Sequence, residues 1–398
     1  YVYVKHGYVF PEEEFKSFGN QWSLNSYKNS SLFGIRNYNG NQKTGYLNFI
    51  YQSILGSSDH KFRTGFSFLF DQYNELFLTK SFNRIDRIPG TFFEYTYSSE
   101  ESLSAVVGIR GDYHNHFGFI LIPRLHIRYT PAEDWVIRSA FGRGFRESNI
   151  FTEHSTIFAS SRDLLINSST NFGYGLQLEK AWNYGINVTH YFFHDYREGT
   201  ISVDLYRTDF ENFTQADLDS NPQAIIFSSV VNGAYSNSAQ IELNMSPLER
   251  LETRLAYRFL DVKNKLNSVW LERALSSKHR ALVNLAYSTE KEDDDDPQMS
   301  YDFTLTWFGP KRIPSTSGNP VGLQSIEQSP SFVIMNLQIT RTFFENFEVY
   351  LGIENLLDYR QENLIIDPMN PTGKYFDASL IWGPVNGRLV YSGLRYKK

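Results

Sequence analysis

The amino-acid sequence predicts an all-β protein, a transmembrane antiparallel β-barrel, and three observations support this prediction. Apolar and polar residues alternate with a period of two along most of the chain. The connections between these segments are alternately short and long. Aromatic residues are abundant, with 33 Phe and 26 Tyr among 398 residues, as expected where aromatic girdles mark two membrane interfaces.

The segment 300–308, SYDFTLTWF, shows the alternation clearly. In an extended chain its apolar residues lie on one face and its Ser, Asp and Thr residues on the other. A soluble sandwich would bury the apolar face in a protein core, whereas a membrane barrel would turn it toward lipid and the polar face toward a wet lumen. Tyr301 and Trp307 lie near the two ends of the apolar row, where an interfacial girdle would place them.

The same period recurs in about sixteen segments, each close to the roughly 9–11 residues that a tilted strand needs to cross a bilayer. No stretch of comparable quality shows helical spacing. Six of the clearest apolar faces, in chain order, span residues 103–109, 125–129, 255–259, 281–287, 333–339 and 349–353.

The connections differ in length at the two ends of the predicted array. Bacterial outer-membrane barrels have short periplasmic turns and longer extracellular loops, and the same asymmetry is expected here. The short connections are 55–60, 97–102, 130–134, 194–199, 246–250 and 342–347, and the long ones are about 20–43, 74–90, 143–181, 212–232, 263–276, 309–330 and 356–385.

Composition excludes several classes of protein. No run approaches the roughly 18 apolar residues of a membrane-spanning helix. The absence of Cys rules out disulfides and zinc–cysteine sites, and we expect no cofactor. A net charge of −6 without a basic cluster argues against nucleic acid as a partner. Other all-β architectures are also disfavoured. A sandwich rarely needs so many long strands, and a propeller or solenoid would show an internal repeat, which we do not find in this sequence.

Five segments between residues 140 and 398 resemble, in order and spacing, motifs of the TonB-dependent outer-membrane receptors. They include a "GFR" segment between strand and loop and an Asn-Leu pattern near the carboxyl end, and together they are fairly specific. The segments are FGRGFRESNIF (141–151), LEKAWNYGINVTHYF (178–192), NGAYSNSAQIELNMSP (232–247), GIENLLDYRQ (352–361) and NGRLVYSGLRYKK (386–398).

This resemblance implies a barrel of about 22 strands around a plug domain that precedes it in the chain. Residues 1–398 would then be the barrel portion, from roughly the seventh strand to the last, without the plug and the first strands. The implied function is active import of a scarce nutrient of the iron-chelate, haem or cobalamin type across the bacterial outer membrane. The implied partners are the TonB system acting through the plug, outer-membrane lipid with lipopolysaccharide, and in some cases a surface lipoprotein.

The long connection 143–181 is the richest candidate for capture of a small-molecule or metal-chelate ligand. We predict that Arg143, Arg146, His154 and Arg162 bind substrate, because fixed cations at the mouth would attract an anionic ligand. The arginines could instead pair with acids inside the wall or with lipopolysaccharide. The connection itself could be only a lid.

Two further segments raise the question of metal binding. His114 and His116 have the two-apart spacing of ligands on a strand, but without a carboxylate at a fixed offset we expect exposed loop histidines and no metal site. The acidic run EKEDDDDP (290–297) could hold calcium loosely. It lacks the Gly and the spaced ligands of an EF-hand, and we expect a solvated charge run.

The sequence contains no sign of an active site. Ser and His residues are scattered without a nucleophile-elbow signature, and the glycines of GRGFRES lead into no helix, so neither hydrolysis nor nucleotide binding is expected. We therefore predict a protein that is not an enzyme. Two rivals to a receptor stay open: a passive porin with an inward-folded constriction loop, and an adhesin or scaffold barrel.

Overall fold

A computed structural model describes residues 1–13, 15–99, 102–291, 293, 296–343 and 346–396. It confirms the all-β class: the described residues form one sheet of 19 strands, and their helical elements are one short α-helix and two 3₁₀-helices of three or four residues each. None of the helices in these residues is long and apolar enough to cross a membrane.

The strands have the following bounds: β1 Val2–Val9, β2 Ser17–Phe33, β3 Arg36–Leu55, β4 Ser57–Phe77, β5 Lys80–Ser98, β6 Leu103–His114, β7 Gly118–Ala132, β8 Trp135–Arg146, β9 Asp163–Asn167, β10 Glu179–His194, β11 Arg197–Asp217, β12 Ala224–Leu248, β13 Leu251–Leu266, β14 Val269–Glu272, β15 His279–Ser288, β16 Gln298–Phe308, β17 Phe332–Phe343, β18 Phe347–Glu354 and β19 Leu389–Tyr396. The helices are α1 Ile150–Glu153, η1 Ser155–Phe158 and η2 Val321–Leu323.

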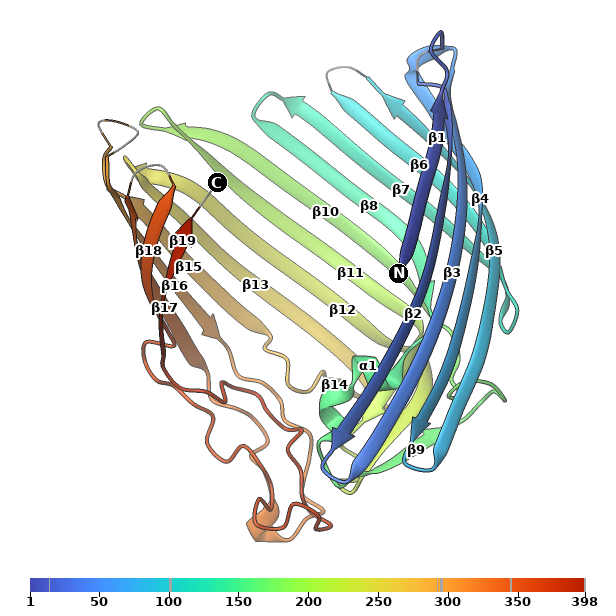
Figure 1. Ribbon diagram of the computed structural model, residues 1–398, viewed down its shortest axis with the longest axis vertical. Coiled ribbons are helices and arrows are strands. Elements are labelled where there is room, and N and C mark those ends of the chain that lie inside the picture. The colour runs from blue at the N-terminus through green and yellow to red at the C-terminus, as the bar shows by residue number, and fades with distance from the viewer. Residues whose placement is uncertain (14, 100–101, 292, 294–295, 344–345, 397–398) are drawn as a thin grey trace.

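The sheet is an antiparallel meander that curves strongly around one concave side (Figure 1). Each wall strand pairs with the next along the chain, and β8 pairs with β10 and β13 with β15 because β9 and β14 belong to connections. Without β9 and β14, the described residues contain seventeen strands that form the wall of the sheet, one more than the roughly sixteen predicted from the sequence. Among the described residues no pairing joins β1 to β19.

Four of the predicted short connections, 55–60, 130–134, 194–199 and 246–250, lie at one end of the sheet (top of Figure 1), whereas 97–102 and 342–347 lie partly outside the described residues. The turn between β10 and β11 consists of Asp195 and Tyr196, both with positive φ, between the paired residues His194 and Arg197. Such two-residue turns with positive φ match the twist of antiparallel strands. The acidic run 290–297 connects β15 to β16 and lies partly outside the described residues.

Several expected long loops are instead extended hairpins. Strands β2 and β3 continue through residues 20–43 to a tight turn at Gly34 and Ile35, and β4 and β5 continue through most of 74–90. The prediction failed here because strand ends that rise beyond a membrane meet water on both faces. Polar residues then occupy both faces and the period-two signal disappears, as in NSYKNSS (25–31). Long connections without wall strands remain at 147–178, 309–331 and 355–388.

The alternation predicted from sequence is present as continuous rows across five strands. One row on strands β12, β13, β15, β16 and β17, which we call the outer row, consists of the aligned residues Leu243, Leu255, Val283, Leu305 and Met335. The neighbouring row on the opposite face is Asn244, Arg254, Asn284, Thr304 and Asn336. Asn284 Nδ2 donates to Thr304 Oγ1 at 2.9 Å, so the polar row is hydrogen-bonded within itself. Arg146 on β8 contacts Glu153 of α1 on the concave side, and the register through β10 and β11 to β12 puts Leu243 on the opposite face. The outer row therefore faces outward, and the polar row faces the concave side.

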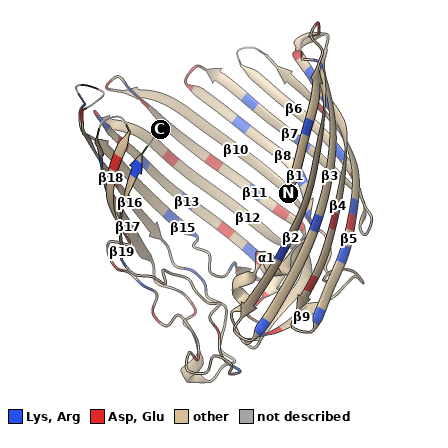
Figure 2. Ribbon diagram, viewed as in Figure 1, with Lys and Arg blue, Asp and Glu red and all other residues tan. Residues whose placement is uncertain are grey.

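Charged residues of both signs are mixed along the strands in the view of Figure 2. They do not form one large region of a single sign in that view. A mixed pattern favours local pairing over long-range steering of a charged ligand.

Candidate ligand-binding mouth

The connection 147–178 folds onto the concave side at the end of the sheet where the long connections gather (Figure 1). It begins with an N-capped turn: Asn149 Oδ1 accepts from the Thr152 backbone N–H at 3.2 Å, and Glu153 Oε1 accepts from the Asn149 N–H at 2.8 Å. These two bonds satisfy donors that would otherwise be orphaned at a helix start. The cap therefore sets the direction in which α1 and η1 enter the mouth.

Apolar residues of this connection pack with strand ends into a buried core, which we call the mouth cluster. Phe158 is 1% exposed and Phe227, on β12, is fully buried. The cluster comprises Tyr38, Phe77, Ile150, Phe151, Ile157, Phe158, Leu164, Tyr174, Leu176, Leu218, Ile225 and Phe227. The connection is thus a packed structure that covers part of the mouth, and its paired apolar residues at 150–151 and 157–158 were the available sequence signal.

A buried carboxylate links this core to the wall. Glu75, near the end of β4, accepts hydrogen bonds from the hydroxyls of Tyr38, at 2.7 Å, and Tyr174. Burial, together with the adjacent Glu75 charge, raises the pKa of Tyr174 above its ordinary value, so this hydroxyl keeps its proton and remains a donor. Tyr174 therefore fixes the far part of connection 147–178 to the wall.

Arg143 and Arg146 lie on opposite faces of β8. Arg143 shares the outward face with Phe141, stacks over Trp182, and pairs with Glu211 at 2.5 Å. Arg146 points into the mouth, where its guanidinium pairs with Glu179 at 2.6 Å and with Glu153 at 2.7 Å. Both arginines were predicted to bind substrate, but residues 143 and 146 occupy odd and even positions on one strand, so their side chains lie on opposite faces of the sheet.

His154 and Arg162 both belong to the mouth. His154 lies edge-on to Phe227 at 5.4 Å between ring centroids, and burial lowers its pKa. Arg162 is only 2% exposed, and its Nε donates to Asp377 at 2.8 Å. Because Asp377 belongs to connection 355–388, this ion pair ties two connections together. Substrate contact by the four predicted residues stays a prediction, and the positions of Arg146 and His154 suit it better than those of Arg143 and Arg162.

A cleft between connections 309–331 and 355–388 was not anticipated from the sequence. Its volume of about 620 Å³ suits a small molecule, and Tyr359, Arg360 and Trp382 are among its lining residues. Trp382 also belongs to a second buried cluster with Ile313, Phe332 and Leu380. The sequence feature that could have indicated this cleft is the motif GIENLLDYRQ, because Tyr359 and Arg360 near its end line the cleft.

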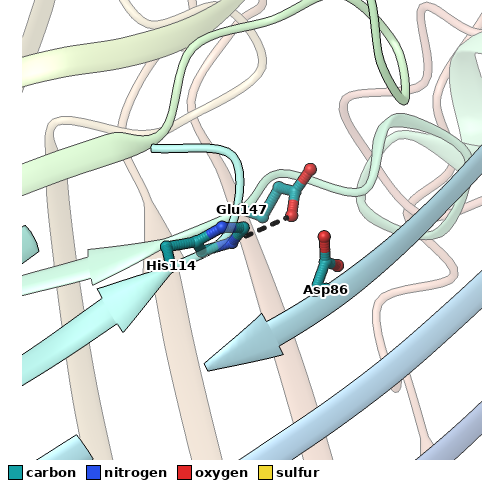
Figure 3. Close-up of side chains that lie close together, drawn as sticks. All are labelled: Asp86, His114 and Glu147. Atoms are coloured by element: carbon teal, nitrogen blue, oxygen red, sulfur yellow. Dashed lines mark ion pairs between the residues drawn. The ribbon is translucent and has the colours of Figure 1, made fainter. Parts of the chain in front are cut away.

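Three potential metal ligands from separate parts of the chain lie close together (Figure 3). Asp86 on β5, His114 at the end of β6 and Glu147 just after β8 offer ligand atoms within 4.8 Å of one another. The expectation of exposed loop histidines is wrong for His114, which is 1% exposed. The reason is packing between segments far apart in the chain: Glu147 Oε2 lies 3.8 Å from His114 Nε2, and the ring of Phe172 stacks on His116 at 4.1 Å between ring centroids.

A curved antiparallel wall with an apolar outer face, tight turns at one end and packed connections over the other defines the class of large outer-membrane-type barrels. Within that class, the chain belongs to the family of TonB-dependent receptor-like β-barrels, because the model of that family matches residues 3–356. Barrels of this family are outer-membrane proteins, and the family consists of receptors and transporters.

Solved structures with the same fold include a mutant of the ferric enterobactin receptor of Pseudomonas aeruginosa, with 16% identity and a TM-score of 0.71 over 99% of this chain and 60% of the receptor. The P. aeruginosa receptor FpvA bound to heterologous pyoverdines shares 11% identity, with a TM-score of 0.64 over 99% of this chain and 55% of FpvA. The copper transporter OprC shares 13% identity, with a TM-score of 0.69 over 99% of this chain and 65% of OprC. No curated protein sequence matches the chain.

Proposed function

We propose that this chain is the barrel portion of an outer-membrane receptor that imports a scarce nutrient with energy delivered by TonB. The observation that carries the proposal is membership of the TonB-dependent receptor-like family over residues 3–356. The chain spans about 60% of the length of the ferric enterobactin receptor that it resembles. In this proposal, a plug and further strands complete the receptor, and the plug is the part that contacts TonB.

The proposed cargo is a metal chelate or related cofactor of the iron-chelate, haem or cobalamin type. Two features of the mouth support a ligand of this size. The cleft beside Tyr359 and Trp382 is within the range of small-molecule sites, and Arg146, whose side chain is 56% exposed, offers a cation at the concave side. The names of the similar structures, a ferric enterobactin receptor and a copper transporter, are consistent with such cargo.

A passive porin is the second candidate, because connection 147–178 folds against the concave side as a constriction loop would. A surface adhesin or scaffold would use the same connections to hold a protein. The three functions differ in their need for energy and in whether a small molecule crosses the membrane.

The test is uptake of labelled ferric enterobactin, haem and cobalamin by cells that produce the complete receptor. For a TonB-dependent receptor, uptake of one of these probes should stop when TonB is deleted or the inner membrane is de-energised, while surface binding persists. A strain carrying an unrelated general porin is the control for passive entry. Uptake that continues without TonB would identify a porin, and absence of uptake for all three probes would contradict the cargo class.

A further inference from the structure

We propose that Asp86, His114 and Glu147 form a resident binding site for one divalent transition-metal cation such as Zn²⁺. The site lies behind the mouth, and the inference does not depend on the proposed transport function. It rests on the arrangement of the three side chains and on the hydrogen bonds that they leave unmade. Of the described residues, these three form the one group of His and carboxylate side chains that could hold a metal.

Arg84 positions the two carboxylates. Its Nε donates to Asp86 Oδ2 at 2.9 Å and lies 3.3 Å from Glu147 Oε1, and its guanidinium rests on the ring of Tyr73 at 3.9 Å. One oxygen of each carboxylate is therefore held by the same cation. Contacts of this kind, in which a neighbouring side chain holds a ligand by its other oxygen, orient metal ligands and keep them in place.

The other oxygen of each carboxylate is buried and unused. Asp86 Oδ1 and Glu147 Oε2 have no hydrogen-bond partner among the described residues, and the Asp86 side chain is only 5% exposed. Leaving such an atom without a partner is unfavourable, and a bound cation would supply the partner. His114 Nε2 faces the same space, 3.8 Å from Glu147 Oε2. Figure 3 shows the three side chains directed toward one another from separate parts of the chain.

The local charge favours a divalent cation. Asp86 and Glu147 carry two negative charges against the single positive charge of Arg84. A donor set of one imidazole nitrogen and two carboxylate oxygens suits zinc and neighbouring transition metals better than calcium or magnesium. Such a site leaves a fourth position for water.

Binding requires two small rearrangements. In tetrahedral zinc sites with bonds of about 2.0–2.2 Å the ligand atoms lie roughly 3.4 Å apart, so the three ligand atoms, which lie within 4.8 Å of one another, must move closer together. The His116 backbone N–H also donates to His114 Nδ1 at 3.2 Å, which places the neutral proton on Nε2. Metal binding moves that proton to Nδ1 and breaks this long hydrogen bond. The metal–ligand bonds must outweigh this local cost, and they give the two unpaired carboxylate oxygens a partner.

The site would fasten the start of connection 147–178 to wall strands β5 and β6. Asp86 and His114 belong to the wall, whereas Glu147 is the first residue after β8. An occupied site therefore adds a cross-link at the base of the segment that carries the mouth cluster. Binding to the folded state alone raises its thermal stability by mass action.

The test uses the full-length protein purified in detergent, stripped with a chelator and dialysed. We expect one equivalent of Zn²⁺ to remain after gel filtration, Co²⁺ to give the visible absorption of a tetrahedral site, and Zn²⁺ to raise the thermal midpoint. His114→Gln and Glu147→Gln should each lose the bound equivalent and the thermal shift. Glu147→Gln leaves the Arg84–Asp86 pair intact, so it serves where His114→Gln folds poorly.

The matched control is His190→Gln. His190 Nδ1 lies 3.3 Å from Asp134 in a histidine–carboxylate pair near the short turns and is not part of the three-ligand group, so this variant should bind Zn²⁺ like the unsubstituted protein. Equal binding in all variants, or no bound Zn²⁺ in the unsubstituted protein, would overturn the proposal. Neither result bears on transport.

Discussion

The outer row and the mouth cluster are two apolar regions that face opposite surroundings. Leu255, in the outer row, is 39% exposed, whereas Phe158 and Phe227, in the mouth cluster, are almost completely buried. The outer row follows a period of two and lies on the face that a membrane barrel turns to lipid. The mouth cluster is aperiodic and packs protein against protein. The comparison teaches that the spacing of apolar residues, more than their number, separates the lipid-facing surface from the core of this protein.

The largest expected effect comes from truncating the mouth cluster. Phe158→Ala should lower the local free energy of unfolding of residues 150–178 by about 3–5 kcal/mol, because a large buried side chain leaves a cavity. Amide hydrogen exchange read by mass spectrometry measures this as faster exchange of that segment. Phe66→Ala removes the same ring from an outward position that is 45% exposed, and it should leave the segment unchanged. Similar effects of both substitutions would erase the distinction between the two regions.

A charge in the outer row should have the next largest effect. Leu305 lies between Tyr301 and Trp307, so Leu305→Arg should cost about 2–4 kcal/mol of unfolding free energy in lipid vesicles, the range for arginine near the bilayer midplane. Thr304→Arg, on the adjacent concave-side position, should cost much less because its side chain faces the lumen. Urea unfolding in vesicles measures both. Comparable costs would mean that the outer row does not face lipid.

Cargo binding should distinguish the two arginines of β8. Arg146→Gln should weaken binding of the transported probe by about tenfold, close to the loss of one charge-assisted contact, because Arg146 faces the mouth. Arg143→Gln should leave binding unchanged, since that side chain pairs with Glu211 on the outward face. Equilibrium binding to intact cells at a fixed salt concentration measures both. A loss in Arg143→Gln alone would place the ligand elsewhere.

The smallest expected effect is the contribution of Glu147 to the pH dependence of stability. Burial would raise the pKa of Glu147, but the adjacent His114 imidazole and the charge of Arg84 outweigh it, so the pKa lies below the ordinary value of 4.5. A depressed carboxylate pKa contributes stability that is present above pH 4.5 and is lost as the pH falls through the folded-state pKa. Thermal midpoints measured with a chelator should therefore fall more steeply below pH 4.5 in the unsubstituted protein than in Glu147→Gln. Parallel curves would contradict this account.

The limits of prediction can be traced to particular residues. Leu255, Val283, Leu305 and Met335 were placed on one face from the sequence, and they are aligned in the sheet. The hairpin of β2 and β3 was mistaken for a long loop, because alternation fades where both faces of a strand meet water. His114 was expected to be exposed, because nothing near it in the chain shows that Glu147 and Phe172 pack near it.

The sequence by itself determined the antiparallel wall, the direction in which its faces point, the positions of the short turns and the family. These follow from a period of two and from local motifs, which neighbouring residues establish without help from the rest of the chain. The tertiary structure alone decided which connections pack into the mouth, which arginine faces it and which three ligands lie close together. Those outcomes depend on contacts between segments far apart in the chain, whose register is fixed only when seventeen strands curve together.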